Sequence, residues 1–184
     1  MNTTQRVIAM GVAALVLAAG VDTSHAAGAS EISGSARTAL SKLYTSSPAA
    51  KLLGGKAKGI LVFPSILKAG FMFGAQGGDG AMFKGGKTVG YYRTLAASYG
   101  FQAGVQKFGY ALFFMTDSGL AYLDKSGGWE LGSGPSLVVV DEGFAKSMTS
   151  TTLTQDVYAY IFDQKGLMGG IGIQGSKITR IHPK

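Results

Sequence analysis

The chain has 184 residues, with 29 glycines, no cysteine and a formal net charge of +7 at pH 7. The absence of cysteine excludes disulfides, thiolate metal sites and anchoring through a lipidated cysteine. Histidine chemistry is also restricted, because only His25 and His182 are present and His25 lies in an N-terminal leader.

Residues 1–26 are typical of a secretory signal peptide. A basic residue near the start is followed by an apolar run over 7–20, and small residues precede Ala27. This run is shorter than the roughly 20 residues that a membrane-spanning helix requires. We therefore expect cleavage between Ala26 and Ala27, an exported protein in the periplasm or associated with the outer membrane, and a single domain over 27–184. An uncleaved N-terminal membrane anchor is the alternative.

Two helices are expected next, over about residues 31–55. The first begins near Ser30, which is placed to cap it, and its apolar residues recur at helical spacing. These apolar residues are Ile32, Ala36, Ala39, Leu40, Leu43 and Tyr44. A second helix is expected from Pro48, with Ser47 as its N-cap and Gly54–Gly55 as its end.

The pattern then changes to short apolar strands over about residues 59–181. Within it, 69–84 is interpreted as two strands about a turn at 77–80, and a short helix is expected at 117–127. Short strands without long intervening helices predict an α+β, β-rich fold. The expected architecture is an antiparallel β-sandwich or a closed barrel-like sheet covered by the N-terminal helices.

Positive charge is concentrated in one half of the expected mature chain. Residues 27–107 contain ten Lys or Arg and two acids, a net charge of +8, whereas 108–184 contain six and seven, a net charge of −1. Such asymmetry indicates an anionic partner, either nucleic acid or a membrane surface. Export argues against nucleic acid and favours the membrane surface. General solubility of a basic exported protein is the alternative explanation.

No pattern in the sequence indicates catalysis, a cofactor or a metal. Gly170, Gly172 and Gly175 have the spacing of a dinucleotide-binding loop, but strand-like sequence stands where the following helix is required. Asp141 and Glu142 are adjacent, so on a strand they would point to opposite faces and could not work as a pair. We therefore expect a protein that is not an enzyme.

Several ordered motifs resemble the SYLF domain family. They include "AKGILVFPSILKAGFMFGAQGGDGAM", "SYGFQAG", "LFFMT", "GWELG" and "QKGLMGGIGIQGSKITRI", and the resemblance extends from about Ala36 to the C-terminus. It implies a β-rich, lipid-binding domain with N-terminal helices and no catalytic residues. Eukaryotic members include a phosphoinositide-binding protein and a yeast actin-binding protein, whereas bacterial members are exported envelope proteins.

The candidate lipid-binding residues are five lysines expected around the corner between the second helix and the first strand. They are Lys42, Lys51, Lys56, Lys58 and Lys68. Their charged ends can contact lipid phosphates while their stems cover apolar surface, and each contributes about 1 kcal/mol near an anionic membrane. The first helix can either lie in the membrane interface or pack its apolar face on the sheet.

The principal hypothesis is a non-catalytic envelope module that binds anionic phospholipid. Two alternatives remain: a structural or protein-interaction module of the envelope with an unknown protein partner, and a small transmembrane β-barrel. The expected strands look shorter than the about 9–11 residues that a barrel strand requires.

Overall fold

The computed structural model describes residues 28–71, 73–99, 104–125, 127–140, 142–149, 153–166, 173 and 175–184. The expected signal peptide lies outside these residues. So do Asp141, Gly170 and Gly172 of the patterns considered above.

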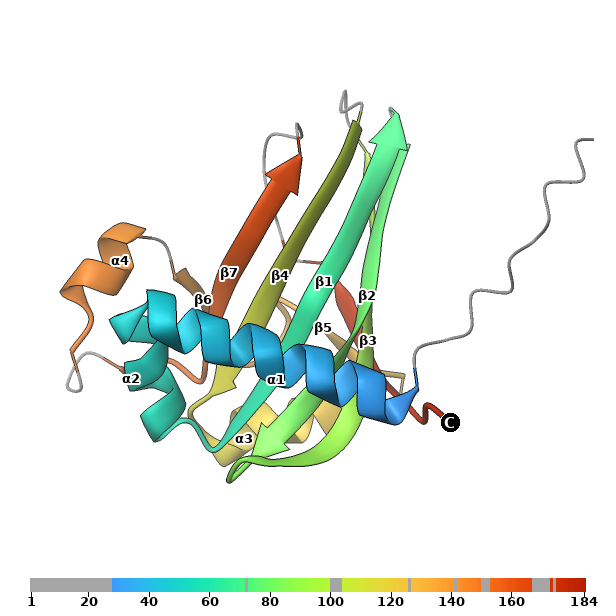
Figure 1. Cartoon of the computed structure of the whole chain (residues 1–184). Helices are drawn as coiled ribbons and strands as arrows, with labels where there is room; N and C mark the ends of the chain where they lie inside the picture. Colours follow the sequence, from blue (N-terminus) through green and yellow to red (C-terminus); the bar gives the residue numbers. More distant parts are fainter. Residues whose placement is uncertain are drawn as a thin grey trace, which may run out of the picture.

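Eight strands form one sheet in the order β5-β8-β3-β2-β1-β4-β7-β6. They are β1 (Gly59–Phe71), β2 (Phe73–Lys84), β3 (Lys87–Tyr99), β4 (Gly104–Phe114), β5 (Trp129–Glu130), β6 (Leu137–Val140), β7 (Val157–Gly166) and β8 (Lys177–Ile181). Neighbouring strands are antiparallel except for the parallel pair β6 and β7. The sheet curls into a half-barrel (Figure 1). The expected β-rich fold with N-terminal helices is therefore confirmed.

The helices lie mainly at one end of the sheet. They are α1 (Ala29–Ser46), α2 (Pro48–Lys56), α3 (Asp117–Ala121) with the following 3-10 turn η1 (Tyr122–Asp124), and α4 (Glu142–Ser147). Helix α1 crosses the convex face of the sheet diagonally, and α2 turns back beside its C-terminal end (Figure 1). The sequence predicted all of these helices except α4.

The two N-terminal helices differ from the prediction at their ends. Gly28, not Ser30, precedes α1 and makes no side-chain cap. Ser47 caps α2 as expected, because its hydroxyl accepts a hydrogen bond from the backbone N–H of Ala50. The prediction that Gly54–Gly55 ends α2 is wrong, because the helix continues to Lys56.

Close packing explains why a glycine lies inside α2. The ring of Tyr44 on α1 lies over Gly54, and a Cβ atom added there would be 2.0 Å from the Tyr44 hydroxyl oxygen. A glycine costs roughly 0.5–1 kcal/mol in a helix interior. Here its missing side chain lets α1 and α2 approach each other.

The prediction of a turn at 77–80 is also wrong, because these residues lie within β2. An irregularity in β1 between Val62 and Leu67 brings the β1 backbone close to β2. A Cβ atom on Gly80 would be 2.4 Å from the carbonyl oxygen of Val62, and one on Gly78 would be 2.3 Å from that of Ser65. Glycine at these positions therefore permits close backbone approach.

Most strands are longer than the sequence predicted. β1 and β3 have 13 residues each, β2 has 12, β4 has 11 and β7 has 10. Segments expected as separate strands on either side of Phe108 form the single strand β4. The long strands extend the sheet well beyond the helices (Figure 1).

Two apolar clusters lie on the two faces of the sheet. The concave face packs aromatic and aliphatic side chains around Phe63, Tyr110 and Trp129. The convex face packs against the apolar side of α1, which contributes Ile32, Ala36, Ala39 and Leu43. Since these side chains are buried, α1 covers the sheet and does not offer this face to a membrane interface.

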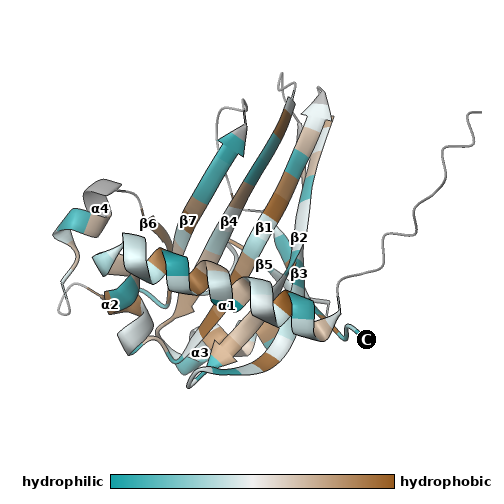
Figure 2. Ribbon diagram, viewed as in Figure 1, coloured by the Kyte–Doolittle hydropathy of each residue, from teal (hydrophilic) through white to brown (hydrophobic). Residues whose placement is uncertain are grey.

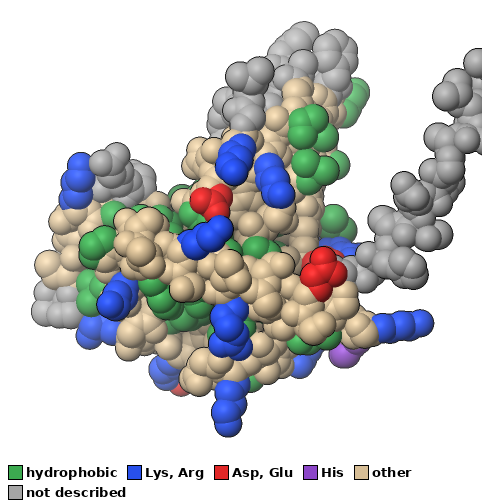
Figure 3. Space-filling view, in the orientation of Figure 1, with side chains coloured by type: hydrophobic (Ala, Val, Ile, Leu, Met, Phe, Trp, Pro, Cys, Tyr) green, Lys and Arg blue, Asp and Glu red, His purple; other side chains and the backbone are tan. Residues whose placement is uncertain are grey.

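Helix α1 covers only part of the convex face. We call the part beneath it the proximal half, which includes Val62 of β1 and Phe113 of β4. The distal half comprises residues 67–71 of β1, 73–77 of β2, 94–99 of β3 and 104–107 of β4. Apolar residues continue along β1 and β4 into the distal half, where hydrophobic side chains reach the surface (Figures 2 and 3).

Candidate functional site

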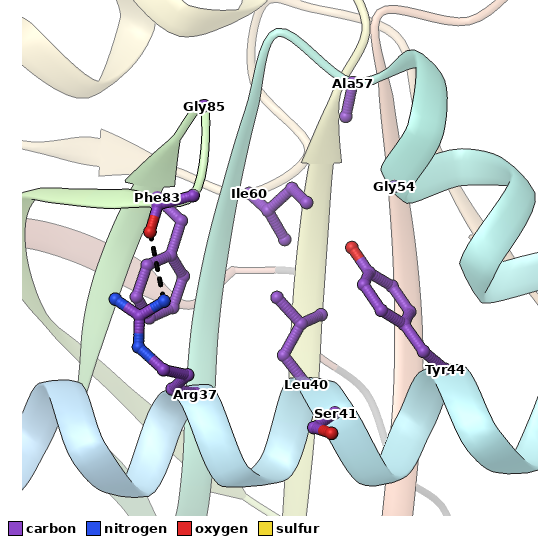
Figure 4. A pocket seen from close by; sticks show the side chains of 10 residues that line it. Arg37, Leu40, Ser41, Tyr44, Gly54, Ala57, Ile60, Phe83 and Gly85 are labelled. Carbon is purple, nitrogen blue, oxygen red and sulfur yellow. Dashed lines mark hydrogen bonds between the residues drawn. The ribbon is translucent and has the colours of Figure 1, made fainter.

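A groove of about 430 Å³ lies where α1, α2 and the ends of β1 and β2 meet (Figure 4). Its apolar wall is formed by Leu40 and Tyr44 from α1, Ile60 from β1 and Phe83 from β2. Helical spacing places Leu40 and Tyr44 on one side of α1, facing the strand ends. The groove therefore combines the first helix-to-sheet corner with the turn that follows β2.

Arg37 gives this groove a fixed positive charge. Its Nη1 donates a hydrogen bond of 3.0 Å to the carbonyl oxygen of Gly86, and its guanidinium carbon lies 5.0 Å from the centre of the Phe83 ring. These contacts hold the guanidinium at the edge of the groove, while the residue stays exposed. Its remaining N–H donors can bind a phosphate, for which the planar guanidinium is well suited.

Tyr44 adds a polar group to the apolar wall. Its ring points toward α2 (Figure 4), and burial raises the pKa of its hydroxyl above the ordinary value. The phenol is therefore neutral at physiological pH and can donate a hydrogen bond. The groove thus offers an apolar wall, one neutral donor and one cation.

Four of the five predicted lysines lie around this corner. Lys42 follows a groove residue on α1, Lys51 lies on α2, and Lys56 and Lys58 flank the groove residue Ala57. Lys42, Lys51 and Lys56 are exposed. Lys51, Lys56 and Lys58 therefore place cations on α2 and just after it, whereas helical spacing points Lys42 to a different side of α1 from Leu40 and Tyr44.

Lys58 differs from the other three because an acid offsets its charge. Its ammonium group pairs with the Asp117 carboxylate at the start of α3, and the two side chains are 48% and 81% exposed. The pair joins residues that are 59 positions apart in the chain. An interaction over this separation was not expected from the sequence.

Lys68 does not join the corner. It is only 4% exposed and lies on the concave face, opposite Gln76 of β2 and Gln106 of β4. From Gly59 to Lys68 the strand covers about 30 Å at the usual rise per residue. The irregularity in β1 also shifts the alternation of side chains between the two faces of the sheet. As a result, Phe63 and Ile66 both face the concave side, and Lys68, two residues after Ile66, faces it as well.

Three further basic residues near the groove were not among the predicted site residues. Arg37 lies three and seven positions before Leu40 and Tyr44, so helical spacing was the signal that these three residues share a face. Lys84 and Lys87 flank the glycine pair between β2 and β3, and that turn lines the groove. A Gly-Gly pair between strand-like segments is a recognised hairpin signal and could have brought these lysines into consideration.

The comparison with protein families bears on the second half of the chain. Residues 95–182 match the family model described as "Ysc84: Las17-binding protein actin regulator". This is the SYLF family that the sequence motifs resemble. This segment of the chain therefore belongs to the SYLF family. No curated protein matches it.

The matched SYLF segment runs from the middle of β3 to just beyond β8. Strands β1 and β2 precede it in the chain but lie in the centre of the same sheet, between β3 and β4. All the residues that line the groove precede the match. The SYLF family is a family of binding domains and is not known for catalysis.

One acidic group in the described part of the chain has a structural role. Within that part, no three His, Asp or Glu side chains are grouped to hold a metal. Asp156 accepts hydrogen bonds from Thr116, Ser118 and Ser136, with distances of 2.7 to 3.3 Å. These bonds, led by that from Thr116, hold the pKa of the Asp156 carboxyl below its ordinary value. They tie the start of α3 to β6 and β7.

None of the helices in the described ranges is long and apolar enough to cross a bilayer.

Proposed function

We propose that this SYLF domain is a non-catalytic module that binds anionic phospholipid at the groove between α1, α2 and the β1–β2 strand ends. The supporting observation is an apolar groove with the exposed guanidinium of Arg37 at its edge and lysines beside it in the chain. A phospholipid joins an anionic phosphate to apolar chains, and the groove presents a surface suited to each.

The phosphate interacts with Arg37 and the hydroxyl of Tyr44, and an acyl segment lies against Leu40, Ile60 and Phe83. The groove volume of about 430 Å³ is within the range of small-molecule pockets. Packing of acyl methylenes against these side chains contributes about 0.8 kcal/mol for each methylene that is fully removed from water.

The corner cations strengthen this binding through the surface charge of the membrane. Among the described residues, no carboxylate lies within 4.0 Å of Arg37, Lys42, Lys51 or Lys56. Each contributes about 1 kcal/mol near an anionic leaflet, and salt weakens that contribution. Lys58 contributes less, because Asp117 already offsets its charge.

We further propose that the membrane is one of the bacterial envelope and that the protein is exported to the periplasm or to the outer-membrane surface. The N-terminal pattern of residues 1–26 supports export. Known actin and lipid binding in the SYLF family supports a binding role. Export favours lipid over actin as the physiological ligand. Fractionation of the native host tests the location, and recovery in the cytoplasm would contradict it.

Co-sedimentation with vesicles tests the function. Vesicles of equimolar phosphatidylcholine and phosphatidylglycerol should bind the purified protein at low salt, and pure phosphatidylcholine vesicles should bind it at least tenfold less, about 1.4 kcal/mol. Equal binding to both, or binding to neither at low salt, would contradict the proposal.

Charge-matched variants locate the site. K51E/K56E should weaken binding to the anionic vesicles by about tenfold or more, because two attractive charges become repulsive. K125E/K184E makes the same change in net charge away from the groove and should retain most of the binding. An equal loss in both variants would show that only net charge matters and that the corner is not the site.

A further inference from the structure

The distal half of the convex face carries a second surface that the groove does not include. Its large apolar side chains are exposed: Leu67 and Leu95 by 55% each, Val105 by 59% and Phe73 by 70%. Ala69, Ala75 and Ala97 are exposed beside them. We call these seven residues the distal patch.

Strand register makes the patch continuous. One row of paired residues crosses the sheet as Leu67, Gly77 and Leu95 on β1, β2 and β3. The next row crosses β4, β1, β2 and β3 as Val105, Ala69, Ala75 and Ala97. Residues paired in register point to the same face of a sheet. The patch is therefore one apolar area across four strands.

The opposite face of the same strands is polar and buried. Lys68, Gln76, Thr94 and Gln106 are each less than a tenth exposed there. The hydroxyl of Tyr110 donates a 2.8 Å hydrogen bond to that of Thr94. In the distal half the usual arrangement is therefore reversed, with polar groups inside and apolar groups outside. Contiguous exposed apolar surface of this kind marks an interaction site.

Lysines border the patch. Lys107 pairs in register with Leu67 on one side and with Lys165 on the other, and Lys177 pairs with Leu95. Asp163 lies two residues from Lys165, so the three lysines keep an excess of positive charge. Figure 3 shows basic side chains beside the hydrophobic surface of the projecting strands.

The acid at the proximal border of the patch is already paired. Arg93 donates hydrogen bonds of 2.6 and 2.8 Å to the two carboxylate oxygens of Asp79. This two-point pair leaves little net charge at that border. The charge around the patch is therefore set mainly by its lysines.

We propose that the distal patch enters the outer apolar layer of a lipid bilayer while Lys107, Lys165 and Lys177 remain at the level of the phosphates. This inference rests on the proposed membrane function but assigns a separate surface to it. The projecting strand ends can enter the bilayer while the helices remain outside (Figure 1).

The chemistry of the patch favours lipid over protein. Protein interfaces depend on Trp, Tyr and Arg anchors in fitted pockets, whereas this patch consists mainly of small and aliphatic side chains on a sheet surface. A bilayer requires no shape match, and lysine stems can cross from its apolar edge to its phosphates. A second copy would bring two lysine borders together and oppose its own docking.

The backbone also suits an apolar environment. β1 is hydrogen-bonded to β2 and β4 along the patch, and β2 is hydrogen-bonded to β1 and β3. The two central strands therefore present no unpaired edge to lipid, where an unsatisfied backbone group is costly.

Fluorescent labelling tests the proposal directly. Because the chain has no cysteine, a single introduced cysteine gives one labelling site. An environment-sensitive nitrobenzoxadiazole dye is attached to L67C, L95C or V105C, and to K125C as a water-facing control. Each protein is mixed with equimolar phosphatidylcholine and phosphatidylglycerol vesicles, and depth is measured with nitroxide-labelled lipids.

The distal labels should shift to the blue and be quenched by nitroxides in the acyl region, while the K125C label should not change. If the protein binds but the distal labels stay in water, the inference is wrong and the groove proposal stands. If the distal labels enter neutral vesicles as readily, the anionic-lipid proposal fails and the inference stands. If no vesicles bind, both fail.

Substitution of the patch gives an independent measurement. L95S/V105S should weaken vesicle binding by about tenfold, because two apolar side chains lose transfer to the bilayer. V89S/V139S removes two exposed valines outside the patch, at 44% and 39% exposure, and should not change binding. Unchanged binding of L95S/V105S, or a label shift caused by self-association without vesicles, would overturn the inference.

Discussion

The proximal and distal halves of the sheet share strands but bury opposite kinds of side chain. On the convex face, Val62 and Phe113 are fully buried beneath α1, whereas Leu67 and Val105 on the same strands are more than half exposed. On the concave face, the proximal half is apolar and the distal half holds Lys68 among polar groups. The proximal half is thus built as a core, and the distal half as a surface.

This difference separates stability from binding. In the proximal half both faces of the strands are packed, so truncation of a side chain leaves a cavity. In the distal half the outward side chains have no such cover, so truncation changes mainly what the protein can bind. The groove lies in the proximal half, where rigid packing fixes Arg37 against Phe83.

The largest expected effect compares one side chain from each half. F113A should lower the free energy of unfolding by about 3–5 kcal/mol, because it opens a cavity beneath α1. V105A should change it by no more than about 0.5 kcal/mol. Urea unfolding followed by circular dichroism measures both. A similar loss of unfolding free energy in the two variants would contradict the distinction between a core half and a surface half.

A smaller effect tests the packing that shapes the groove. G54A should be less stable than G55A by roughly 1–3 kcal/mol, because its new methyl group overlaps the Tyr44 ring. Nothing lies within 4 Å of a Cβ atom on Gly55, so G55A should gain helix propensity and become slightly more stable. Thermal unfolding compares them. Equal stability would mean that Tyr44 does not rest on α2.

Acidic pH should lower the stability of the protein through protonation of Asp156. Its carboxyl pKa is lowered in the folded protein, so its contribution to stability is full above the unfolded value of about 3.9 and is lost as pH falls through the lowered value. D156A should cost about 1–2 kcal/mol at neutral pH. The unfolding temperature of D156A should depend less on pH in that acid range than the unfolding temperature of the unsubstituted protein does. An equally steep pH dependence in both proteins would argue against this role of Asp156.

The smallest expected effect distinguishes the corner from the distal patch. D117N removes the charge that faces Lys58, at a cost to stability below about 1 kcal/mol because the pair is exposed. Binding to anionic vesicles should rise by a few fold as Lys58 becomes available. Dyes on the distal patch should report the same depth as before. Weaker binding would show that Lys58 acts only through its pair with Asp117.

Local patterns predicted the parts of the fold that depend on neighbours in sequence. The spacing of Ile32, Ala36 and Leu43 predicted α1, and Ser47 before Pro48 predicted the start of α2. Both signals act within one or two helical turns. The β-rich character and the position of four corner lysines followed from similarly local evidence.

Long-range contacts account for what could not be predicted. Gly54 resembles a helix end until Tyr44 is known to pack over it. Lys68 resembles a surface lysine until the irregularity in β1 turns it inward. The same irregularity places Leu67 on the convex face with Val62, and the position of α1 then decides that Val62 is covered and Leu67 exposed.

The most direct test of the groove is a backbone NMR titration of the protein with a soluble, short-chain phosphatidylglycerol. We predict saturable shifts of the Gly54, Ala57 and Gly86 amides and of the Arg37 side-chain N–H, and smaller shifts with the matching phosphatidylcholine. If these resonances do not move while others shift on saturation, the groove is not the phospholipid site.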